Sequence, residues 1–556
     1  MLTTSKTVCN TLSDLLVAYG VSHAVVSPGS RNAPILIALA REPKITKHVV
    51  VDERTAAFVA LGIAQHCGKP VALVCTSGTA MLNYSPALAE AYYQQIPLIV
   101  ISADRLENQI DQNDSQTIRQ FGAFANFVNA SFHINSHDEG EIVNEQICKA
   151  IHSAISLPKG PVHINLPLGE PLYDMAERST WANPITFPKQ DFTIPEKELS
   201  ELSNIYNKSP KVMIFVAQNQ PSTELNDALN KLAKLPNTIV LTENIANLNV
   251  EGSICAIERS MSQMNEAQRE EYAPDLLIYC GGAPVSRMLK QFLRSIPAVE
   301  QWRVGVDRNK IDTMHHLTRS INSKPEQFFG QLAEKTMPIE SNYAQMWQAL
   351  NANATASQEQ FLSDAPWSDI KAMQIILSSI PQGYALQISN GTSIRYTQLF
   401  DNYQLPYCHC NRGVSGIDGS TSTALGFSLV GDEQTLLITG DMSFGYDIGG
   451  LAAEVPNRRL KIIVLDNAGG EIFRFIKGAS SLPELEEYLA VNRRQPIQKY
   501  ADTFGFKYFE AESVESLNMA LPAFYSTDKC AILAVKTNPQ TTAQTFRNYY
   551  KRNKYQ

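Results

Sequence analysis

The C-terminal part of the chain repeats its N-terminal part when the two are aligned at an offset of 364 residues without a gap. The matches include two apolar runs, a three-residue motif and an arginine: 71–75 on 435–439, 97–101 on 461–465, Ala60–Gly62 on Ala424–Gly426, and Arg31 on Arg395. The runs are short, rich in β-branched residues and closed by turn residues, which is typical of buried parallel strands. The repeat therefore predicts two α/β domains of one type, at residues 1–180 and 365–556.

The region between the two copies has its own alternation of apolar runs and helical segments. The runs lie at 212–217, 238–242, 276–282 and 302–306. Such alternation again indicates a parallel sheet. We therefore expect a central domain at 195–335. The whole chain is predicted to be an α/β protein of three consecutive domains, each with a central, mainly parallel sheet flanked by helices.

The charge and the cysteines exclude several classes of protein. The 556-residue chain has a formal net charge of −8 and no Lys/Arg-rich run, which argues against nucleic-acid binding. No apolar stretch approaches the roughly 18 residues that a membrane span needs. The nine cysteines lack metal-type spacing, and the N-terminal segment lacks a secretory pattern. We therefore expect a cytoplasmic protein with reduced thiols.

Two polar loops directly follow the repeated runs of the C-terminal copy. Asp441 lies in one loop, and Asn467 lies 26 residues later in the other. Either loop alone would be interpreted as an ordinary turn, in which Asp, Asn and Gly are common. Together they place a carboxylate and an amide at the carboxyl ends of two parallel strands, where α/β sheets bind ligands. With the carbonyl of Gly469, they predict a site for Mg²⁺ or Mn²⁺, which prefer oxygen ligands.

The N-terminal copy differs at the equivalent places. It has Ser77 and Ala103 there, so it lacks these metal ligands. It carries instead an acid, Glu53, between an apolar run at 48–51 and a helical pattern, where the C-terminal copy has Ile417. An acid at a helix start is common because it interacts favourably with the helix dipole. If the strand ends of the two copies face one another, however, Glu53 would point into the cleft that holds the metal loops.

The metal loops resemble the diphosphate motif of thiamine-diphosphate enzymes, in which an opposing domain supplies a glutamate to the cofactor. Five further segments resemble the 2-succinyl-5-enolpyruvyl-6-hydroxy-3-cyclohexene-1-carboxylate synthase family of menaquinone biosynthesis: 27–34, 52–58, 75–80, 103–105 and 411–419. The resemblance implies a transferase that decarboxylates 2-oxoglutarate on thiamine diphosphate and adds the resulting carbanion to isochorismate. It also implies a homodimer or a homotetramer.

The resemblance implies roles for particular residues. Glu53 would be catalytic, because it would protonate a ring nitrogen of the cofactor and thereby favour the tautomer that activates the reactive carbon. Cofactor contacts would come from Asn390, Gly416, Ile417, Ser443, Ile472 and Phe473. Substrate contacts would come from Ser30, Arg31, Arg105, Gln116, Arg287, Arg395 and Arg412.

Four of the arginines fit this chemistry without the resemblance. All four follow predicted strands of the outer domains: Arg31, Arg105, Arg395 and Arg412. Arginine binds carboxylates bidentately and stays charged, whereas a single loop arginine is usually only solvated. Several other assignments have structural alternatives: Ser30 as a helix cap, Gln116 as an exposed helix residue, and Ile417, Ile472 and Phe473 as core residues. The chain also departs from the family at Ser286, Leu106 and Asp466, where a basic residue, a proline and an asparagine are common.

Two other functions stay open from the sequence. A different thiamine-diphosphate-dependent 2-oxoacid decarboxylase or carboligase would share the metal loops, but such enzymes tend to lack the segment at 27–31 and a cleft with several arginines. A non-catalytic dicarboxylate-binding protein would not need Glu53, Asp441 and Asn467 together. A Rossmann dehydrogenase is poorly supported, because no Gly-x-Gly-x-x-Gly motif follows the first strand.

Overall fold

The computed structural model describes residues 2–296, 298–401, 405–453, 459–476 and 478–552. In these ranges the chain is an α/β protein with three parallel sheets flanked by helices, which confirms the predicted fold class. The chain divides into two compact units: residues 1–190 with 411–435 and 443–460, and residues 191–410 with 436–442 and 461–556. The three domain boundaries expected from the sequence stay a prediction.

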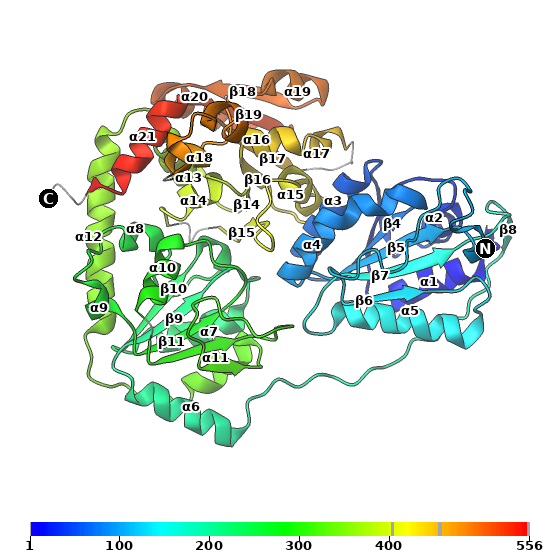
Figure 1. The fold of residues 1–556 in the computed structure, drawn as a ribbon, viewed down its shortest axis with the longest axis horizontal. Coiled ribbons are helices and arrows are strands. Elements are labelled where there is room, and N and C mark those ends of the chain that lie inside the picture. Colours follow the sequence, from blue (N-terminus) through cyan, green and yellow to red (C-terminus); the bar gives the residue numbers. More distant parts are fainter. Residues whose placement is uncertain (1, 297, 402–404, 454–458, 477, 553–556) are drawn as a thin grey trace. The chain divides into compact units, whose positions relative to one another are not determined.

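The first unit contains a six-stranded parallel sheet in the order β3-β2-β4-β5-β7-β6 (Figure 1). Its strands are β2 (His23–Val26), β3 (Thr46–Val49), β4 (Val71–Cys75), β5 (Leu98–Asp104), β6 (Ala130–His133) and β7 (Val162–Pro167). Its helices are α1 (Thr7–Ala18), α2 (Ala33–Ala40), α3 (Glu53–Cys67), α4 (Ser85–Gln94) and α5 (Gly140–Ile155). A short antiparallel pair joins β1 (Leu2–Thr4) to β8 (Met175–Glu177).

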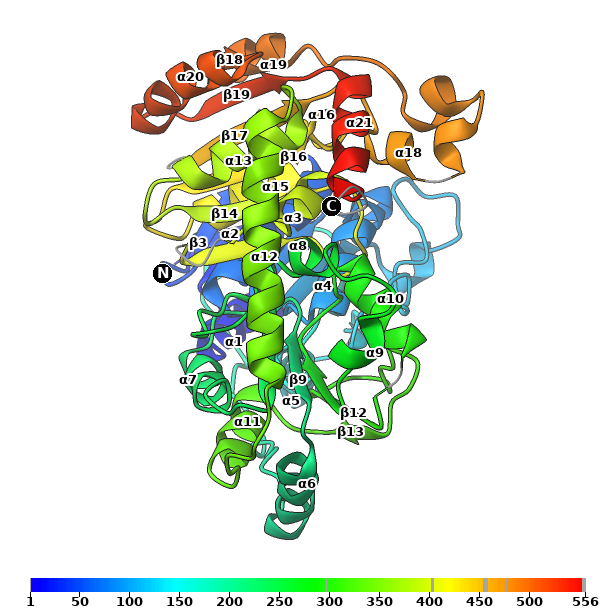
Figure 2. The ribbon, with the colours of Figure 1, turned by 90° about the vertical axis from the view of Figure 1, so that its left-hand side faces the viewer.

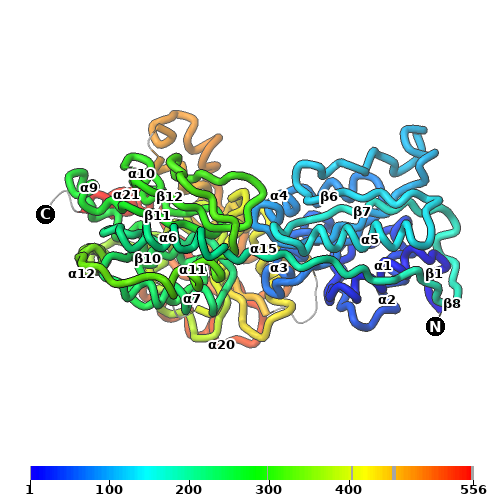
Figure 3. The backbone as a smooth tube through the Cα atoms, turned by 90° about the horizontal axis from the view of Figure 1, so that it is seen from below, coloured from blue at the N-terminus to red at the C-terminus, as the bar shows by residue number. Residues whose placement is uncertain are grey.

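Helices cover both faces of this sheet, which explains why its strands are almost continuously apolar. Ala24 and Val26 of β2 share one core cluster with Leu16 of α1, Leu39 of α2 and Ile147 of α5. In Figure 3, α5 runs beside β6 and β7 with α1 next to it. The other face is covered by α3, which packs on β2, β4 and β5.

The second unit contains a five-stranded parallel sheet in the order β10-β9-β11-β12-β13. Its strands are β9 (Val212–Val216), β10 (Thr238–Thr242), β11 (Leu276–Cys280), β12 (Glu300–Val304) and β13 (Arg319–Ile321). Its helices are α6 (Glu196–Lys208), α7 (Thr223–Leu232), α8 (Ile257–Met261), α9 (Arg269–Tyr272), α10 (Arg287–Ser295) and α11 (Pro325–Ala333). Ile214 packs toward α6, α7 and α11, and Phe215 packs toward α8, α10 and the next helix, so the sheet is again buried on both faces.

That next helix, α12 (Tyr343–Asp364), connects the central sheet to the last one (Figure 2). Tyr343 and Trp347 near its start belong to the core of the central sheet, and Leu362 near its end belongs to the core of the last sheet. In the described ranges, no helix is long and apolar enough to cross a membrane.

The last sheet has six strands in the order β15-β14-β16-β17-β19-β18. The strands are β14 (Ala385–Ile388), β15 (Tyr407–Cys410), β16 (Thr435–Gly440), β17 (Leu460–Asp466), β18 (Lys507–Ala511) and β19 (Ala531–Lys536). The helices of this part of the chain are α13 (Asp369–Ser379), α14 (Ser393–Thr397), α15 (Ser420–Ser428), α16 (Asp441–Tyr446), α17 (Gly449–Ala452), α18 (Ile472–Phe475), α19 (Ile497–Thr503), α20 (Val514–Ser526) and α21 (Pro539–Tyr549). The strand order is the same as in the first sheet, which confirms the internal repeat.

The equivalent helices of the two copies, α3 and α15, pack against each other within the first unit (Figure 1). A Cβ on Gly62 would lie 2.0 Å from the carbonyl oxygen of Thr423, and a Cβ on Gly426 would lie 2.0 Å from that of Val59. These distances leave no room for a side chain. The repeated glycine therefore lets the two helix backbones approach each other closely.

One predicted strand ends earlier than its apolar run. The run at 48–51 indicates a strand to Val51, but β3 ends at Val49. Val49 lies opposite Val26, the last residue of β2, and β3 is at the edge of the sheet. Val51 therefore has no strand beside it and is 73% exposed, and α3 begins two residues later.

Candidate active site

Two loops at the ends of the neighbouring strands β16 and β17 carry the predicted metal ligands. Asp441 is buried, and its carboxylate accepts hydrogen bonds from the backbone N–H groups of Met442 and Gly469, both at 2.8 Å. The bond from Gly469 joins the two loops. Burial raises the pKa of Asp441 to about 7, which the two N–H donors oppose. A nearby cation would favour the ionised form of such a carboxylate.

Asn467 presents a buried side-chain oxygen without a hydrogen-bond partner among the described residues. Its Nδ2 donates a hydrogen bond to Oδ2 of Asp369 at 2.6 Å. Its Oδ1 is buried and accepts no hydrogen bond from the described residues. Leaving a buried acceptor without a partner costs free energy, so this atom fits a ligand that binds beside it. Asp369 thus determines which end of the amide faces that ligand.

Gly469 supplies the third expected ligand from a backbone conformation that requires glycine. Its φ is +119°, and a Cβ would lie 2.2 Å from the carbonyl oxygen of Ala490. In the described part of the chain, no group of three or more His, Cys, Asp or Glu side chains could hold a metal. One carboxylate, one amide oxygen and one carbonyl suit Mg²⁺ or Mn²⁺, with positions left for ligand oxygens and water. The residues present therefore fit the expected cation.

Two residues that hold these loops escape the sequence analysis. Asp369, the first residue of α13, also accepts a hydrogen bond from the hydroxyl of Thr537 at 2.6 Å. Arg474 of α18 donates to the carbonyl of Ala468 at 3.2 Å and to the carboxylate of Glu471 at 2.8 Å. An acid at a helix start is too common to indicate the role of Asp369. Arg474 lies only five residues after Gly469 in the sequence. This proximity to the metal loop is the sequence feature that could have indicated its role.

Glu53 lies at the first turn of α3 but does not cap it. The adjacent Asp52 is the cap, because its carboxylate accepts from the N–H groups of Arg54 at 2.9 Å and Thr55 at 3.4 Å. Glu53 is half-buried and has no hydrogen bond or ion pair with the described residues. Burial is the main cause of the raised pKa of the Cys75 thiol, and the negative charge of Glu53 raises it further. Glu53 therefore lies close to Cys75, at the end of β4. The carboxylate of Glu53 is therefore available to a ligand.

Arg31 and Arg105, two predicted substrate-binding residues, lie near one another in the first unit. Arg31 is buried, donates to the carbonyl oxygen of Leu168 at 2.7 Å and pairs with Glu170 at 3.4 Å. Burial, and next the positive charge of Arg105, lower the pKa of Arg31. The carboxylates of Glu170 and Asp114 oppose this lowering. Two positively charged groups in one region attract an anion.

Ser30 and Gln116 belong to exposed loops of the same unit. Ser30 is exposed, and its carbonyl accepts from the N–H of Ala33 at 3.2 Å. Gln116 has a φ of +55°, and its backbone lies 3.4 Å from where a Cβ of Gly78 would be. The alternative of Gln116 as a helix residue is wrong, because this left-handed conformation does not occur within an α-helix.

The loop at 411–419 carries three predicted residues and is fixed from two sides. The carboxylate of Glu90 on α4 accepts from the N–H groups of Gly413 at 2.6 Å and Val414 at 2.8 Å, beside Arg412. Ser443 is buried and donates to the carbonyl of Ile417 at 2.6 Å. The three predicted residues of this loop, Arg412, Gly416 and Ile417, are half-buried. Glu90 is a further positioning residue that no sequence motif indicates.

In the second unit, three predicted residues line one cavity of about 430 Å³: Arg287, Arg395 and Ile472. Arg287 begins α10, Arg395 lies on α14, and Ile472 begins α18. Two other predicted residues lie elsewhere in this unit. Asn390 is buried after β14 and accepts a hydrogen bond from the thiol of Cys410 at 3.4 Å, and Phe473 lies against Gly470.

The structure explains why serine precedes Arg287. Ser286 is buried and caps α10, because its hydroxyl oxygen accepts from the N–H of Leu289 at 3.1 Å. The same hydroxyl donates to Glu258 at 2.8 Å. A basic side chain could not make this cap.

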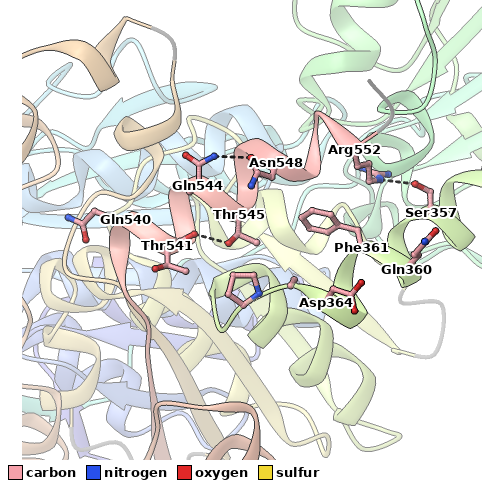
Figure 4. A pocket seen from close by; sticks show the side chains of 12 residues that line it. Ser357, Gln360, Phe361, Asp364, Gln540, Thr541, Gln544, Thr545, Asn548 and Arg552 are labelled. Atoms are coloured by element: carbon pink, nitrogen blue, oxygen red, sulfur yellow. Dashed lines mark hydrogen bonds between the residues drawn. The ribbon is translucent and has the colours of Figure 1, made fainter. Parts of the chain in front are cut away.

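A larger cavity, of about 690 Å³, lies away from all predicted site residues, between α12 and α21 (Figure 4). Its lining is mostly amides and hydroxyls. The hydroxyl of Thr545 donates to the backbone carbonyl of Thr541 at 2.8 Å, and Nε2 of Gln544 donates to Oδ1 of Asn548 at 2.8 Å. Arg552 at its edge donates to Ser357 at 3.3 Å. Its size alone therefore does not make it the active site.

Comparisons with known proteins identify one cofactor-binding domain in the N-terminal part of the chain and another in the C-terminal part. The N-terminal TPP binding domain of thiamine pyrophosphate enzymes matches residues 6–123, and the C-terminal TPP binding domain matches residues 390–535. The chain is thus built around the two cofactor-binding domains of an enzyme that uses thiamine pyrophosphate, also called thiamine diphosphate.

Curated relatives narrow the family. Two of them are named 2-succinyl-5-enolpyruvyl-6-hydroxy-3-cyclohexene-1-carboxylate synthase. The protein from Porphyromonas gingivalis is 39% identical, and the alignment covers 97% of this chain and 96% of the relative. The protein from Flavobacterium psychrophilum is 38% identical, and the alignment covers 98% of this chain and 97% of the relative. A protein of the same name from Desulfotalea psychrophila is 36% identical, and the alignment covers 89% of this chain and 92% of the relative. The chain belongs to this synthase family.

Proposed function

We propose that the chain forms 2-succinyl-5-enolpyruvyl-6-hydroxy-3-cyclohexene-1-carboxylate from 2-oxoglutarate and isochorismate, a step of menaquinone biosynthesis. The observation that carries the proposal is the buried Oδ1 of Asn467, which accepts no hydrogen bond in the described part of the chain and lies in a loop bonded to Asp441. It supports a cation that holds a diphosphate at the end of the last sheet. Family membership supplies the particular reaction.

The protein holds the cofactor at two ends. When bound, thiamine diphosphate supplies the carbon nucleophile and the electron sink for decarboxylation. Asp441, Asn467 and Gly469 hold Mg²⁺ or Mn²⁺ and, through it, the diphosphate. Contacts to the cofactor come from Asn390, Gly416, Ile417, Ser443, Ile472 and Phe473. The carboxylate of Glu53 holds a proton at the nitrogen of the pyrimidine ring.

Arginines bind and orient the two dicarboxylate substrates. Substrate contacts come from Ser30, Arg31, Arg105, Gln116, Arg287, Arg395 and Arg412. Their guanidinium groups stay charged and match the planar carboxylate. The proximity of Arg31 and Arg105 to each other supports this role.

We further propose that two copies of the chain form each site, with Glu53 from one copy and the metal loops from the other. The active form is then a homodimer or a homotetramer. We propose a cytoplasmic enzyme, which agrees with nine cysteines that form no disulfide.

One assay separates this function from its alternatives. The purified chain is given thiamine diphosphate, Mg²⁺ and either 2-oxoglutarate or pyruvate, with and without isochorismate, and CO₂ and product mass are measured. The proposal expects the synthase product from 2-oxoglutarate plus isochorismate only. A preference for pyruvate would indicate another decarboxylase or carboligase. Dicarboxylate binding without CO₂ release or metal-dependent cofactor binding would indicate a non-catalytic receptor.

A further inference from the structure

The cavity that contains Arg287 and Arg395 has more positive charge than the sequence analysis predicts. Arg547 of α21 and Lys551 just after it also line the cavity, and Glu258 is its acid. The carboxylate of Glu258 already accepts hydrogen bonds from the hydroxyl of Ser286 at 2.8 Å and the N–H of Met288 at 2.9 Å. In a chain of net charge −8, four cations around one cavity indicate an anionic ligand.

Arg547 on α21 and Lys551 just after it have different roles. Arg547 donates to the carbonyl oxygen of Arg474 at 2.7 Å and so fixes α21 to α18. Lys551 is exposed, and its ammonium has no hydrogen bond or ion pair with the residues that the structure describes. A lysine at a cavity wall without a protein partner can reach a ligand carboxylate.

Most of the remaining cavity wall is apolar, and its polar members are Gln398 and Tyr550. Ile472, Ile476, Phe475 and Phe546 line it, and the two phenylalanine rings lie with centroids 4.7 Å apart. Such a wall fits a ring better than an open-chain acid, because a ring buries more apolar surface against it. A volume of about 430 Å³ lies within the range of small-ligand sites.

We infer that Lys551 binds a carboxylate of the cyclic acceptor substrate, a dicarboxylate whose ring lies on the wall formed by Ile472, Phe475 and Phe546. The inference rests on the proposed function, in which this acceptor is isochorismate. Arg287 and Arg395 bind one end of the acceptor and Lys551 binds the other. Arg547 positions α21, the helix that ends two residues before Lys551.

The test is a steady-state comparison of Lys551→Gln with the wild type, varying each substrate in turn with cofactor and Mg²⁺ present. We expect the KM for isochorismate to rise about tenfold, as for loss of one charge-assisted hydrogen bond. The KM for 2-oxoglutarate and kcat should change less than about twofold. Lys551→Arg should restore most of the affinity. Lys499→Gln, at an exposed lysine of α19, is the matched control.

An unchanged KM for isochorismate, or equal rises for both substrates, would overturn the inference while leaving the proposed function in place. If the wild type forms no product, the proposed function fails, and calorimetry with isochorismate alone then decides the inference. It survives if Lys551→Gln weakens binding relative to the wild type and Lys499→Gln does not. It fails if the wild type does not bind isochorismate.

Discussion

The first and the last sheets have the same strand order but carry different chemistry in equivalent loops. After β16 and β17 stand Asp441 and Asn467, whereas the corresponding places of the first sheet have Ser77 and Ala103. The first sheet has instead an acid at the start of α3, Glu53. The strand order and the helix contact are preserved, whereas the residues of these loops at the carboxyl ends differ.

This difference teaches that the scaffold and the site respond to separate constraints. The central strands are buried on both faces, so most of their residues are apolar in both copies. The loops are free of that requirement, so one copy could specialise in a cation and the other in a proton. Exchanging or deleting loop residues should therefore affect one function without the other.

The largest effect is expected from Asp441→Ala. Removing the carboxylate should weaken metal-dependent binding of thiamine diphosphate on the order of 1,000-fold, beyond the 10- to 100-fold typical of outer-shell partners. Calorimetry with cofactor and Mg²⁺ measures the affinity. Ser77→Ala, at the equivalent place of the first sheet, should change it by less than about threefold. Similar losses in both variants would contradict the assignment of the metal to one copy.

Glu53→Gln tests the other half of the comparison. Glutamine cannot hold the proton as an acid, so turnover should fall by about 10²- to 10⁴-fold while cofactor affinity stays nearly unchanged. Asp52→Asn is the matched control, because asparagine caps a helix as well as aspartate and removes a charge one residue away. Near-normal turnover in Glu53→Gln, or an equal loss in Asp52→Asn, would refute the catalytic role.

The fold was predictable from the sequence because parallel strands leave a strong signal. The apolar runs at 71–75 and 238–242 match β4 and β10 residue for residue. The repeat could be detected only where the loops of the two copies have equal length. Beyond β5, loop lengths differ, so the equivalence of β7 with β19 needed the sheet order.

Residues of the candidate site could be proposed from the sequence where they stand in loops after strands, but not where they act through tertiary contacts. Asp441 and Asn467 follow strands in polar motifs, and Arg287 was reached only through the family resemblance. Asp369 and Glu90 precede their partners by about a hundred residues or more and show no motif of their own. Their roles depend on packing that sequence periodicity does not encode.

Asp369→Ala should separate positioning from coordination in the last sheet. Without Asp369, the amide of Asn467 loses the acceptor that fixes its orientation, so Mn²⁺ binding in the presence of thiamine diphosphate should weaken about 10- to 100-fold. Asp369→Asn keeps an acceptor oxygen and should retain most of the affinity. Thermal unfolding of both variants measures any loss of stability. Equal metal affinities in wild type and Asp369→Ala would contradict the positioning role.

The smallest effect is expected from substitutions in the helix contact that the two copies share. Gly62→Ala and Gly426→Ala each place a Cβ 2.0 Å from a backbone oxygen of the other helix, so each should destabilise the first unit by about 1–3 kcal/mol. Urea unfolding measures the loss. Gly330→Ala on α11 meets no atom within 4 Å and should be neutral or stabilise the protein by about 0.5–1 kcal/mol.

If Gly62→Ala and Gly426→Ala lower the free energy of unfolding equally, the two helices contribute equivalently to the contact between α3 and α15. The double variant should cost less than the sum, because the first Cβ already separates α3 from α15. If only one glycine matters, the contact is asymmetric, and the two copies differ in their scaffold as well as in their loops. That result would break the separation of scaffold from site on which the comparison rests.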